Sequence, residues 1–358
     1  MESLCIITRI ALNCGGVLMS SSEYRKLQIT GGSTIIVSLP KHWINQHNLS
    51  KGDLVTIEGL SSGDLRISPI QYNTTKTVVT IDCGKSSRGL HDLLIGAYLT
   101  GCEKIKVVSS KKITRVMRNE IRDFLRDTRG MEIESDEEKK IQIISILNPT
   151  ELRLQVSVNR MYILISSLVT DCFEVLSGES IELLSDILER ERQIDARRLL
   201  IERQVASALK RPSVEKMLAV NRFSAMEHAN IARILERMGD HATRLAFLVR
   251  DNSKLIKTKP TEMPFSTIPI WVNELKTLVH NMYTKDVTVI HNAKTNLSFL
   301  SESIEEYEND LWTGRKSSER LFCEFQISES IRRICAYGVN FSEALLNMFM
   351  HERIERDE

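Results

Sequence analysis

The chain opens with short runs of alternating apolar and polar residues and ends in long stretches with helical periodicity. Between residues 22 and 70, four β-branched runs are separated by turn residues such as Gly31-Gly32, and a short helix after Pro40 lies between the second and third runs. This pattern predicts the order strand, strand, helix, strand, strand. A domain of about fifty residues buries little apolar surface, so we expect it to need a second copy or a neighbouring domain.

Residues 73–147 alternate between strand-like and helix-like runs, in the order strand, helix, strand, helix, strand, strand. This alternation predicts a small α/β domain that links the two ends of the chain. Its segment DCGKSSRG, residues 82–89, contains Gly-Lys-Ser but lacks the upstream glycine spacing of a Walker A loop. That difference argues against a nucleotide-binding loop, and the sequence assigns the domain no role.

From residue 148 onward, apolar positions recur with helical spacing, and the proline-containing segment 258–269 separates two groups of three helices. The runs that begin at Ile231 and Ile331 share Ile-x-Arg-Ile, which indicates a weak internal repeat and paired bundles. The expected helices cover 151–177, 179–209, 213–250, 270–296, 298–312 and 318–351.

Composition narrows the class of protein. A length of 358 residues predicts two or three domains, and 42% hydrophobic with 27% charged residues is normal for a soluble globular protein. The net charge of +1 predicts neither nucleic-acid nor membrane binding overall, so any such surface must be local. Seven scattered cysteines without a Cys-x-x-Cys pair indicate reduced thiols and a cytoplasmic protein.

These patterns together predict a multidomain α+β protein. The expected domains are strand-rich at 22–72, α/β at 73–147, and helical at 148–257 and 264–358. The first residues are too short and too polar a stretch to cross a membrane, and Met19 would be a natural start. We therefore expect 1–21 to be a disordered or mis-started extension, and we expect no membrane insertion.

Two carboxylates on one expected helix raise a chemical question. Glu236 and Asp240 stand four residues apart, where like charges repel by roughly a few tenths of a kcal/mol. At 100° per residue they point away from the apolar stripe and lie near Arg233, Arg237 and Arg244. Ordinary surface ion pairs are therefore one explanation of this helix taken alone.

A second pair with the same spacing, Glu191 and Asp195, lies beside the apolar stripe of the preceding helix. Carboxylates at such an edge need compensation, because desolvating a charge is costly. Arg192, Arg197 and Arg198 could supply it, and so could a cation. Two adjacent antiparallel helices could direct all four carboxylates at one spot, and hard cations, iron or manganese accept such oxygen-rich ligand sets.

The segments IARILERMGDHATRLA and ERERQIDARRLLIERQ resemble the signature of PhoU, the phosphate-uptake regulator family, and the resemblance covers about 151–350. It implies two tandem three-helix bundles whose E(D)-x-x-x-D motifs hold surface metal clusters containing iron or zinc. It assigns Glu191, Asp195, Glu236 and Asp240 to the first bundle and Glu306 and Asp310 to the second. The second bundle is degenerate, because its partner motif is replaced at Ala336 and Asn340.

The run from Tyr24 to Pro69, with its VSLPKHW and L-x-x-GD-x-V-x-I elements, resembles a SpoVT/AbrB-type swapped-hairpin domain. That resemblance implies a β-barrel formed by two interlaced chains, with Arg25, Lys26 and Lys41 as DNA contacts. Between 22 and 70 the chain has five basic and four acidic side chains, so binding per chain would be weak and a dimer or higher oligomer is expected. Alternatively, Arg25 and Lys26 are a solubilising pair on an edge strand.

An AbrB-like front with a PhoU-like back resembles an arrangement known from archaeal phosphate regulators. It implies a cytoplasmic, DNA-binding regulator of phosphate uptake that senses phosphate status through metal or through a partner such as the phosphate transporter ATPase. One alternative is a dimeric signalling adaptor that does not bind DNA. A carboxylate-bridged metalloenzyme is disfavoured, because the helices lack Glu-x-x-His spacing and a nucleophile–base pair, and His228 and His241 are expected to be structural.

Overall fold

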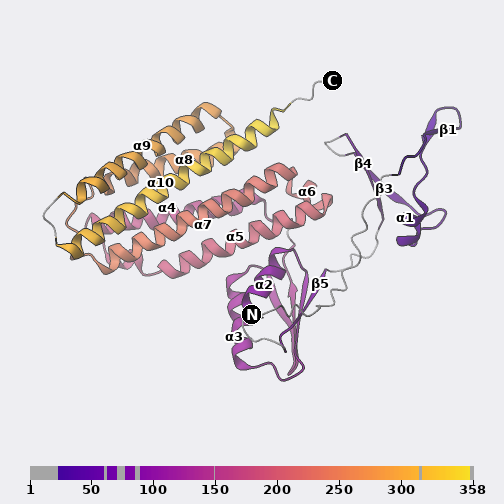
Figure 1. The fold of residues 1–358 in the computed structure, drawn as a ribbon, viewed down its shortest axis with the longest axis horizontal. Coiled ribbons are helices and arrows are strands. Elements are labelled where there is room, and N and C mark those ends of the chain that lie inside the picture. Colours follow the sequence, from indigo (N-terminus) through magenta and orange to yellow (C-terminus); the bar gives the residue numbers. More distant parts are fainter. Residues whose placement is uncertain are drawn as a thin grey trace, which may run out of the picture. The chain divides into compact units, whose positions relative to one another are not determined.

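The computed structural model describes residues 23–59, 63–70, 77–84, 89–148, 150–313 and 317–354. The chain forms two compact units, Met1–Thr75 and Lys76–Glu358, and each is described by itself (Figure 1). The extension expected at 1–21 lies outside the described residues. Within the described residues, no helix combines the length and the apolar character needed to cross a bilayer.

The first unit consists of two hairpins and a short helix, in the order that the sequence predicts. Strands β1 (Gln28–Thr30) and β2 (Thr34–Ile36) pair antiparallel, and the connecting Gly31 and Gly32 adopt positive φ angles of 60° and 93°. Helix α1 (Lys41–Gln46) follows Pro40, and β3 (Val55–Gly59) pairs antiparallel with β4 (Leu65–Pro69).

No described residue of this first unit is buried, so it has no hydrophobic core of its own there. Ile29 and Ile35 face each other across the first hairpin with exposed fractions of 75% and 63%, and Ile57 on β3 is 60% exposed. The hairpins form two separate two-stranded sheets. The expected β-barrel is therefore not closed by the described residues of a single chain.

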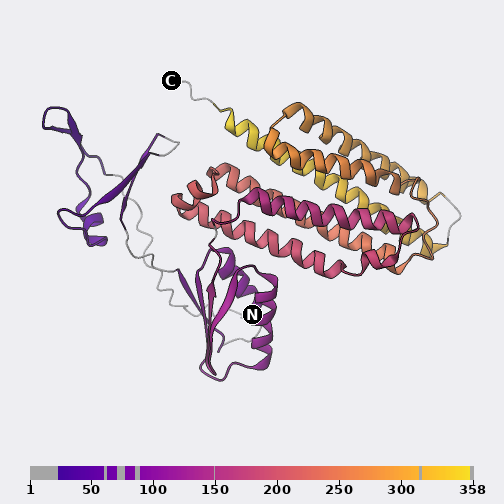
Figure 2. The ribbon, with the colours of Figure 1, turned by 180° about the vertical axis from the view of Figure 1, so that it is seen from behind.

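A four-stranded sheet with two helices begins the second unit. Its order of elements is the predicted one, and the sheet order is β5-β6-β8-β7, with β5 parallel to β6 and the other pairs antiparallel. Both helices lie on one face of the sheet (Figures 1 and 2) and bury Leu94, Tyr98 and Phe124 there. The elements are β5 (Val78–Asp82), α2 (Leu90–Leu99), β6 (Lys104–Val108), α3 (Arg115–Asp127), β7 (Met131–Asp136) and β8 (Lys140–Ser145).

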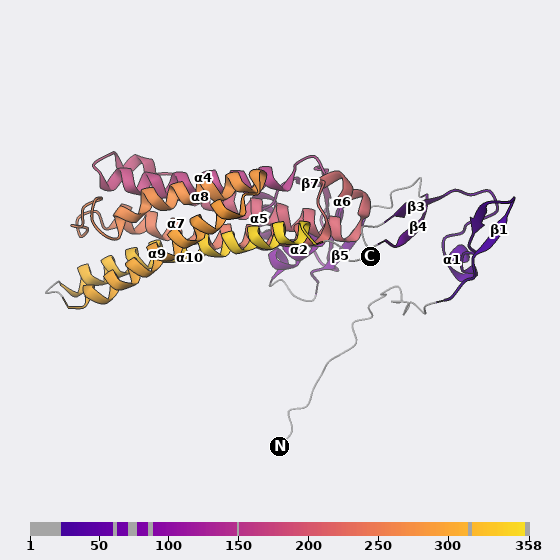
Figure 3. The ribbon, with the colours of Figure 1, turned by 90° about the horizontal axis from the view of Figure 1, so that it is seen from above.

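The rest of the second unit is helical. The two expected groups of three long helices, α4-α5-α7 and α8-α9-α10, share one hydrophobic core, with α7 against α10 and α4 against α8 (Figure 3). Two 3-10 turns, η1 (Ile181–Leu184) and η2 (Phe265–Thr267), precede α5 and α8. The helices are α4 (Leu154–Leu176), α5 (Ile187–Lys210), α6 (Pro212–Leu218), α7 (Arg222–Asp251), α8 (Ile268–Thr284), α9 (Val287–Leu311) and α10 (Ser318–Glu352).

Three helix boundaries differ from the sequence prediction. The helix expected at 179–209 begins at Ile187, after the 3-10 turn η1, and two further differences are breaks within the later helices. The helix expected at 213–250 is divided at Ala219, which has a left-handed φ of 53°, and Asn221 then caps α7 by accepting from the Ser224 N–H at 2.7 Å. The boundary expected near residue 297 lies at Lys285, whose φ is 56°, and Asp286 caps α9. Neither break contains glycine or proline, the residues that most clearly mark helix ends.

Two arginines, Arg203 in the C-terminal half of α5 and Arg211 just after its end, connect α5 to the α/β domain. The buried Arg203 guanidinium donates to the carbonyl oxygens of Tyr98 and Cys102, both at 2.7 Å, and lies 4.7 Å from the Tyr98 ring centroid. Arg211 pairs with Glu103 at 2.7 Å. These contacts satisfy carbonyls at and just after the C-terminal end of α2, where a positive charge is favourable.

Candidate metal centre

Helices α5 and α7 run antiparallel, and polar side chains join them along their length. Arg198 Nε lies 3.3 Å from a Glu236 oxygen, and Arg233 Nε donates to Glu202 at 2.7 Å. This register places Asp195 of α5 opposite Gly239 and Asp240 of α7, and Glu191 opposite Thr243 and Arg244, one turn further along α7. The pairing that the sequence predicts between these two helices is therefore present.

A glycine sets the close approach of the two helices. A Cβ atom on Gly239 would lie 3.1 Å from Ile194 Cδ1 and 3.2 Å from Ile194 Cγ2, which leaves almost no room for a side chain. Asp195 follows Ile194, and Asp240 follows Gly239. The tight contact of the two core residues therefore brings the two carboxylates next to them together.

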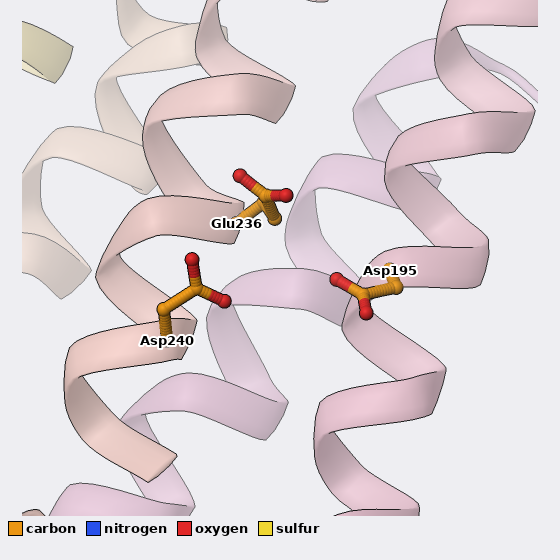
Figure 4. A group of neighbouring side chains, drawn as sticks. All are labelled: Asp195, Glu236 and Asp240. Carbon is orange, nitrogen blue, oxygen red and sulfur yellow. The ribbon is translucent and has the colours of Figure 1, made fainter. Parts of the chain in front are cut away.

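Three carboxylates form a cluster at this place. Asp195, Glu236 and Asp240 each offer an oxygen, and these oxygens all lie within 4.8 Å of one another. Figure 4 shows Asp195 of α5 facing Glu236 and Asp240 of α7 across the space between the helices. Asp195 and Glu236 are half-buried, and Asp240 is exposed.

The electrostatics of the cluster indicate a deficit of positive charge. Burial, first, and the charge of Glu236, second, raise the pKa of Asp195 to about 6, although the nearby Arg198 opposes the shift. Partial burial also raises the pKa of Glu236 and of Asp240, with Arg198 opposing both shifts. Like charges held together in this way attract a cation, and carboxylate oxygens fit a hard metal ion.

Glu191, the fourth expected ligand, lies beside the cluster and outside the group of three. Partial burial raises its pKa first, and the charge of Asp240 contributes next, so the two carboxylates interact. Glu191 and Asp240 both line a groove of about 480 Å³ along α7, together with Thr243 and Arg244.

The second helical group places its expected ligands differently. Glu306 and Asp310 lie at exposed positions of α9, and no described group of three ligand side chains includes them. The counterpart of the Gly239 contact is Gly338, whose Cβ would lie 2.9 Å from Leu297 Cδ1. The next residues there are Ser298 and Val339 in place of two aspartates.

Glu306 and Asp310 come eight and twelve residues after Ser298, which is about 12 and 18 Å along a helix. Close to the contact itself, Lys294 pairs with Glu343 at 2.8 Å. A lysine therefore supplies positive charge near the crossing of α9 and α10. The arrangement gives no structural support to Glu306 and Asp310 as ligands of a second cluster.

The predicted DNA contacts are accessible in the first unit. Arg25, Lys26 and Lys41 are all exposed, the first two before β1 and the third at the start of α1. Arg25 forms an ion pair with Glu23, and His42 lies 3.5 Å from the same carboxylate. One of the three cations is thus already paired within the unit.

Sequence reasoning did not single out two of the residues that shape the centre. Gly239 could have been found, because a lone glycine inside a strongly helical pattern often marks a close helix contact. Arg198 was one of three candidate arginines on α5. Only the structure distinguishes it, through its contact with Glu236.

Comparisons with known proteins agree with this architecture. Residues 158–249 match the PhoU domain, and this range spans α4 to α7 and contains all four first-group carboxylates. Residues 28–75 match a family described as antidote-toxin recognition MazE, bacterial antitoxin, and this range includes Lys41 but begins after Arg25 and Lys26. The comparison with curated proteins found no match.

PhoU domains are known to bind metal, and they imply phosphate regulation, while the MazE/AbrB type suggests DNA binding. Both are typically regulatory domains without enzymatic activity. The matches fall on the two parts of the chain where the hairpins and the carboxylate cluster lie. The chain therefore contains an N-terminal MazE/AbrB-type antitoxin domain and a C-terminal PhoU domain.

Proposed function

We propose that this protein is a DNA-binding regulator of phosphate uptake whose PhoU domain binds a divalent or transition metal ion. The observation that carries the proposal is the carboxylate cluster, in which three oxygens lie within 4.8 Å inside the range that matches the PhoU domain. Asp195, Glu236 and Asp240 would hold the ion, and Glu191 would complete the set. An all-oxygen set fits iron or manganese better than zinc, which usually takes histidine and cysteine.

A bound ion would supply a compact positive charge between α5 and α7. The same helix α5 carries Asp195 and, two turns later, Arg203, which binds the C-terminal end of α2. Because one helix carries both residues, a shift of α5 on metal binding would also move the contacts that it makes with the α/β domain. Regulation would then require that the loaded and empty states differ in affinity for DNA or for a partner such as the phosphate transporter ATPase.

The proposed DNA-binding unit is a homodimer or a higher oligomer. Its isoleucines are exposed on both hairpins, and Ile29, Ile35 and Ile57 would be covered if a second chain completed a barrel. Arg25, Lys26 and Lys41 would then be present twice, which raises phosphate affinity.

Metal content tests the first part of the proposal. Purified protein should contain stoichiometric metal by inductively coupled plasma mass spectrometry, and the Glu191/Asp195/Glu236/Asp240→Ala variant should lose most of it. The matched control is Glu306/Asp310→Ala, which removes two carboxylates of the same spacing and should keep the metal. A folded wild-type protein that takes up no iron, manganese or zinc would contradict the metal site.

Genomic fragments retained by the protein test the second part. Fragments near phosphate-transport genes should be enriched, and the Arg25/Lys26/Lys41→Ala variant should lose this enrichment because phosphate contacts supply most of the affinity. The control, Lys111/Lys112/Arg115→Ala, removes three exposed positive charges from the α/β domain and should bind normally.

One observation favours a second function, a dimeric signalling adaptor that does not bind DNA. Arg25 already pairs with Glu23, as expected of a surface pair on a domain that only dimerises the chain. For an adaptor, the wild type and the Arg25/Lys26/Lys41→Ala variant would retain the same fragments equally poorly. The dimer and the metal would be kept in both.

A further inference from the structure

Arg198 occupies a central place in the carboxylate cluster. It lies on α5, three residues after Asp195, and its guanidinium is within 3.2 Å of Glu202 and 3.3 Å of Glu236. The side chain is 23% exposed. Its Nε atom is buried and makes no hydrogen bond, although the Glu236 oxygen is close. Charge attraction rather than a directed bond therefore holds Nε at Glu236.

The charge of Arg198 reaches every member of the cluster. Among the described residues, it is the cation that lowers the pKa of Asp195, Glu236 and Asp240 alike. Other basic groups act on part of the cluster: Arg237 lowers the pKa of Glu236 and of Asp240, and His241 lowers the pKa of Asp240 more than Arg198 does. Arg198 is thus the shared counter-charge of the three carboxylates.

Arg198 also borders free space. It lines a cavity of about 470 Å³ between α5 and the helices of the α/β domain, together with His91, Asp127 and Arg192. His91 Nε2 lies 3.2 Å from Asp127 on the far wall, and Arg192 lies 4.0 Å from the same aspartate. Asp92, Glu191 and Asp195 line the same cavity, so a guanidinium that leaves Glu236 remains near carboxylates there, with Arg126 and Arg192 as the competing cations.

We propose that Arg198 is a built-in counter-cation, which stabilises the three carboxylates in the metal-free protein and is displaced toward this cavity by a bound divalent ion. This inference rests on the proposed metal site. Because the arginine and the metal compete for the Glu236 carboxylate, Arg198 weakens metal binding and keeps loading reversible. When the ion binds, the displaced guanidinium would also change the charge next to the residues of α2 and α3 that line the cavity.

Manganese titration of the full-length, chelator-treated protein tests the competition. At pH 8, above the pKa of about 6 of Asp195, calorimetry should show that Arg198→Met binds Mn²⁺ at least about tenfold more tightly than wild type, because a positive charge next to the ion is gone. Arg198→Lys keeps the charge and should stay closer to wild type. The matched control is Arg233→Met, which removes a 65% exposed cation that pairs with the same Glu202 and should change affinity by less than about twofold.

Weaker or unchanged Mn²⁺ binding by folded Arg198→Met would overturn the inference, because a merely supporting residue gives that result. If Arg198→Met binds Mn²⁺ and wild type does not, the metal-sensing function fails and the counter-cation role stands.

A metal-free double-mutant cycle separates the two hypotheses when neither protein binds Mn²⁺. Arg198→Met should lower the melting temperature in the wild-type background, where three carboxylates lose their counter-charge. It should change the melting temperature much less in an Asp195→Asn/Glu236→Gln background. Equal effects in both backgrounds would overturn the counter-cation role independently of any metal.

Discussion

Asp195 shows how one carboxylate can link pH, stability and metal binding. Its pKa is raised from an ordinary 3.8 to about 6, first by burial and then by the charge of Glu236. A carboxyl with a raised pKa binds its proton more tightly in the folded than in the unfolded protein. It therefore favours folding when protonated, and this contribution is lost as pH rises from about 4 to about 6.

We predict a pH-dependent effect of Asp195→Asn on the metal-free protein. The asparagine does not ionise, so the variant should gain free energy of unfolding relative to wild type between pH 4 and about 6. The gain should be about 1 kcal/mol after allowance for solvent screening of this half-buried group. Urea unfolding with a chelator at pH 4, 5, 6 and 7.5 measures it, with the exposed Glu306→Gln as control. A constant difference across this range would contradict the prediction.

At the scale of single residues, the sequence predicts the chemistry better than the geometry. The four-residue spacing of Glu236 and Asp240 and of Glu191 and Asp195 can be read from the sequence, and the two helices that carry these pairs pack against each other. Which oxygens meet depends on the contact between Ile194 and Gly239, which involves residues distant in the chain. That is why three carboxylates cluster and Glu191 lies beside them.

The two halves of helix α5 have different contacts. Its N-terminal half carries the carboxylates that face α7, and its C-terminal half binds the carbonyl oxygens of Tyr98 and Cys102 through Arg203. Arg203 is 4% exposed, so these two hydrogen bonds are shielded from water. They anchor the α/β domain to the helix that carries Asp195 of the carboxylate cluster.

We predict that Arg203→Met destabilises the second unit by about 3 kcal/mol, because two charge-assisted hydrogen bonds are lost and two carbonyl groups lose their donor. Methionine retains much of the apolar volume, which separates the polar loss from a packing defect. Urea unfolding followed by circular dichroism measures the change. Arg211→Met, which removes the partly exposed pair with Glu103, should cost at most about 1 kcal/mol. Equal effects of the two variants would argue against the anchor.

Helix boundaries show where periodicity stops being informative. The apolar pattern predicted six long helices, and the structure has them, but α8 ends at Thr284 rather than near residue 296. The turn at Lys285 and Asp286 has no glycine or proline, and a left-handed lysine is not a sequence signal. The local signal at this boundary is instead the helix start, because Asp286 accepts from the N–H groups of Thr288 and Val289 at the N-terminus of α9.

For the whole molecule, the order of elements could be predicted and the closure of the first unit could not. Alternating β-branched runs and glycine turns gave two hairpins around a short helix, as observed. The same reasoning indicated that about fifty residues are too few for a core. The single chain agrees, because Ile29, Ile35 and Ile57 remain exposed. If a second chain covers them, as we propose, the sequence of one chain does not describe that contact.

We predict that Ile57→Asp separates the proposed dimer while leaving the single chain folded. Ile57 is 60% exposed in one chain, so a charge there costs that chain little, whereas in an interface it would be an unpaired buried charge. Analytical ultracentrifugation should show a shift from dimer to monomer. Thr56→Asp adds the same charge one residue away, on the other face of β3, and should remain dimeric.

DNA affinity should follow the oligomeric state. Each neutralised phosphate adds about −0.9 to the slope of log affinity against log salt, so three basic side chains per chain predict a slope of about −5 for a dimer. Ile57→Asp should reduce this slope by about half, because a monomer presents one set of Arg25, Lys26 and Lys41. A variant that is monomeric and keeps the full slope would show that the hairpins of one chain bind DNA alone. The exposed Ile29, Ile35 and Ile57 would then contact a partner other than a second copy of the chain.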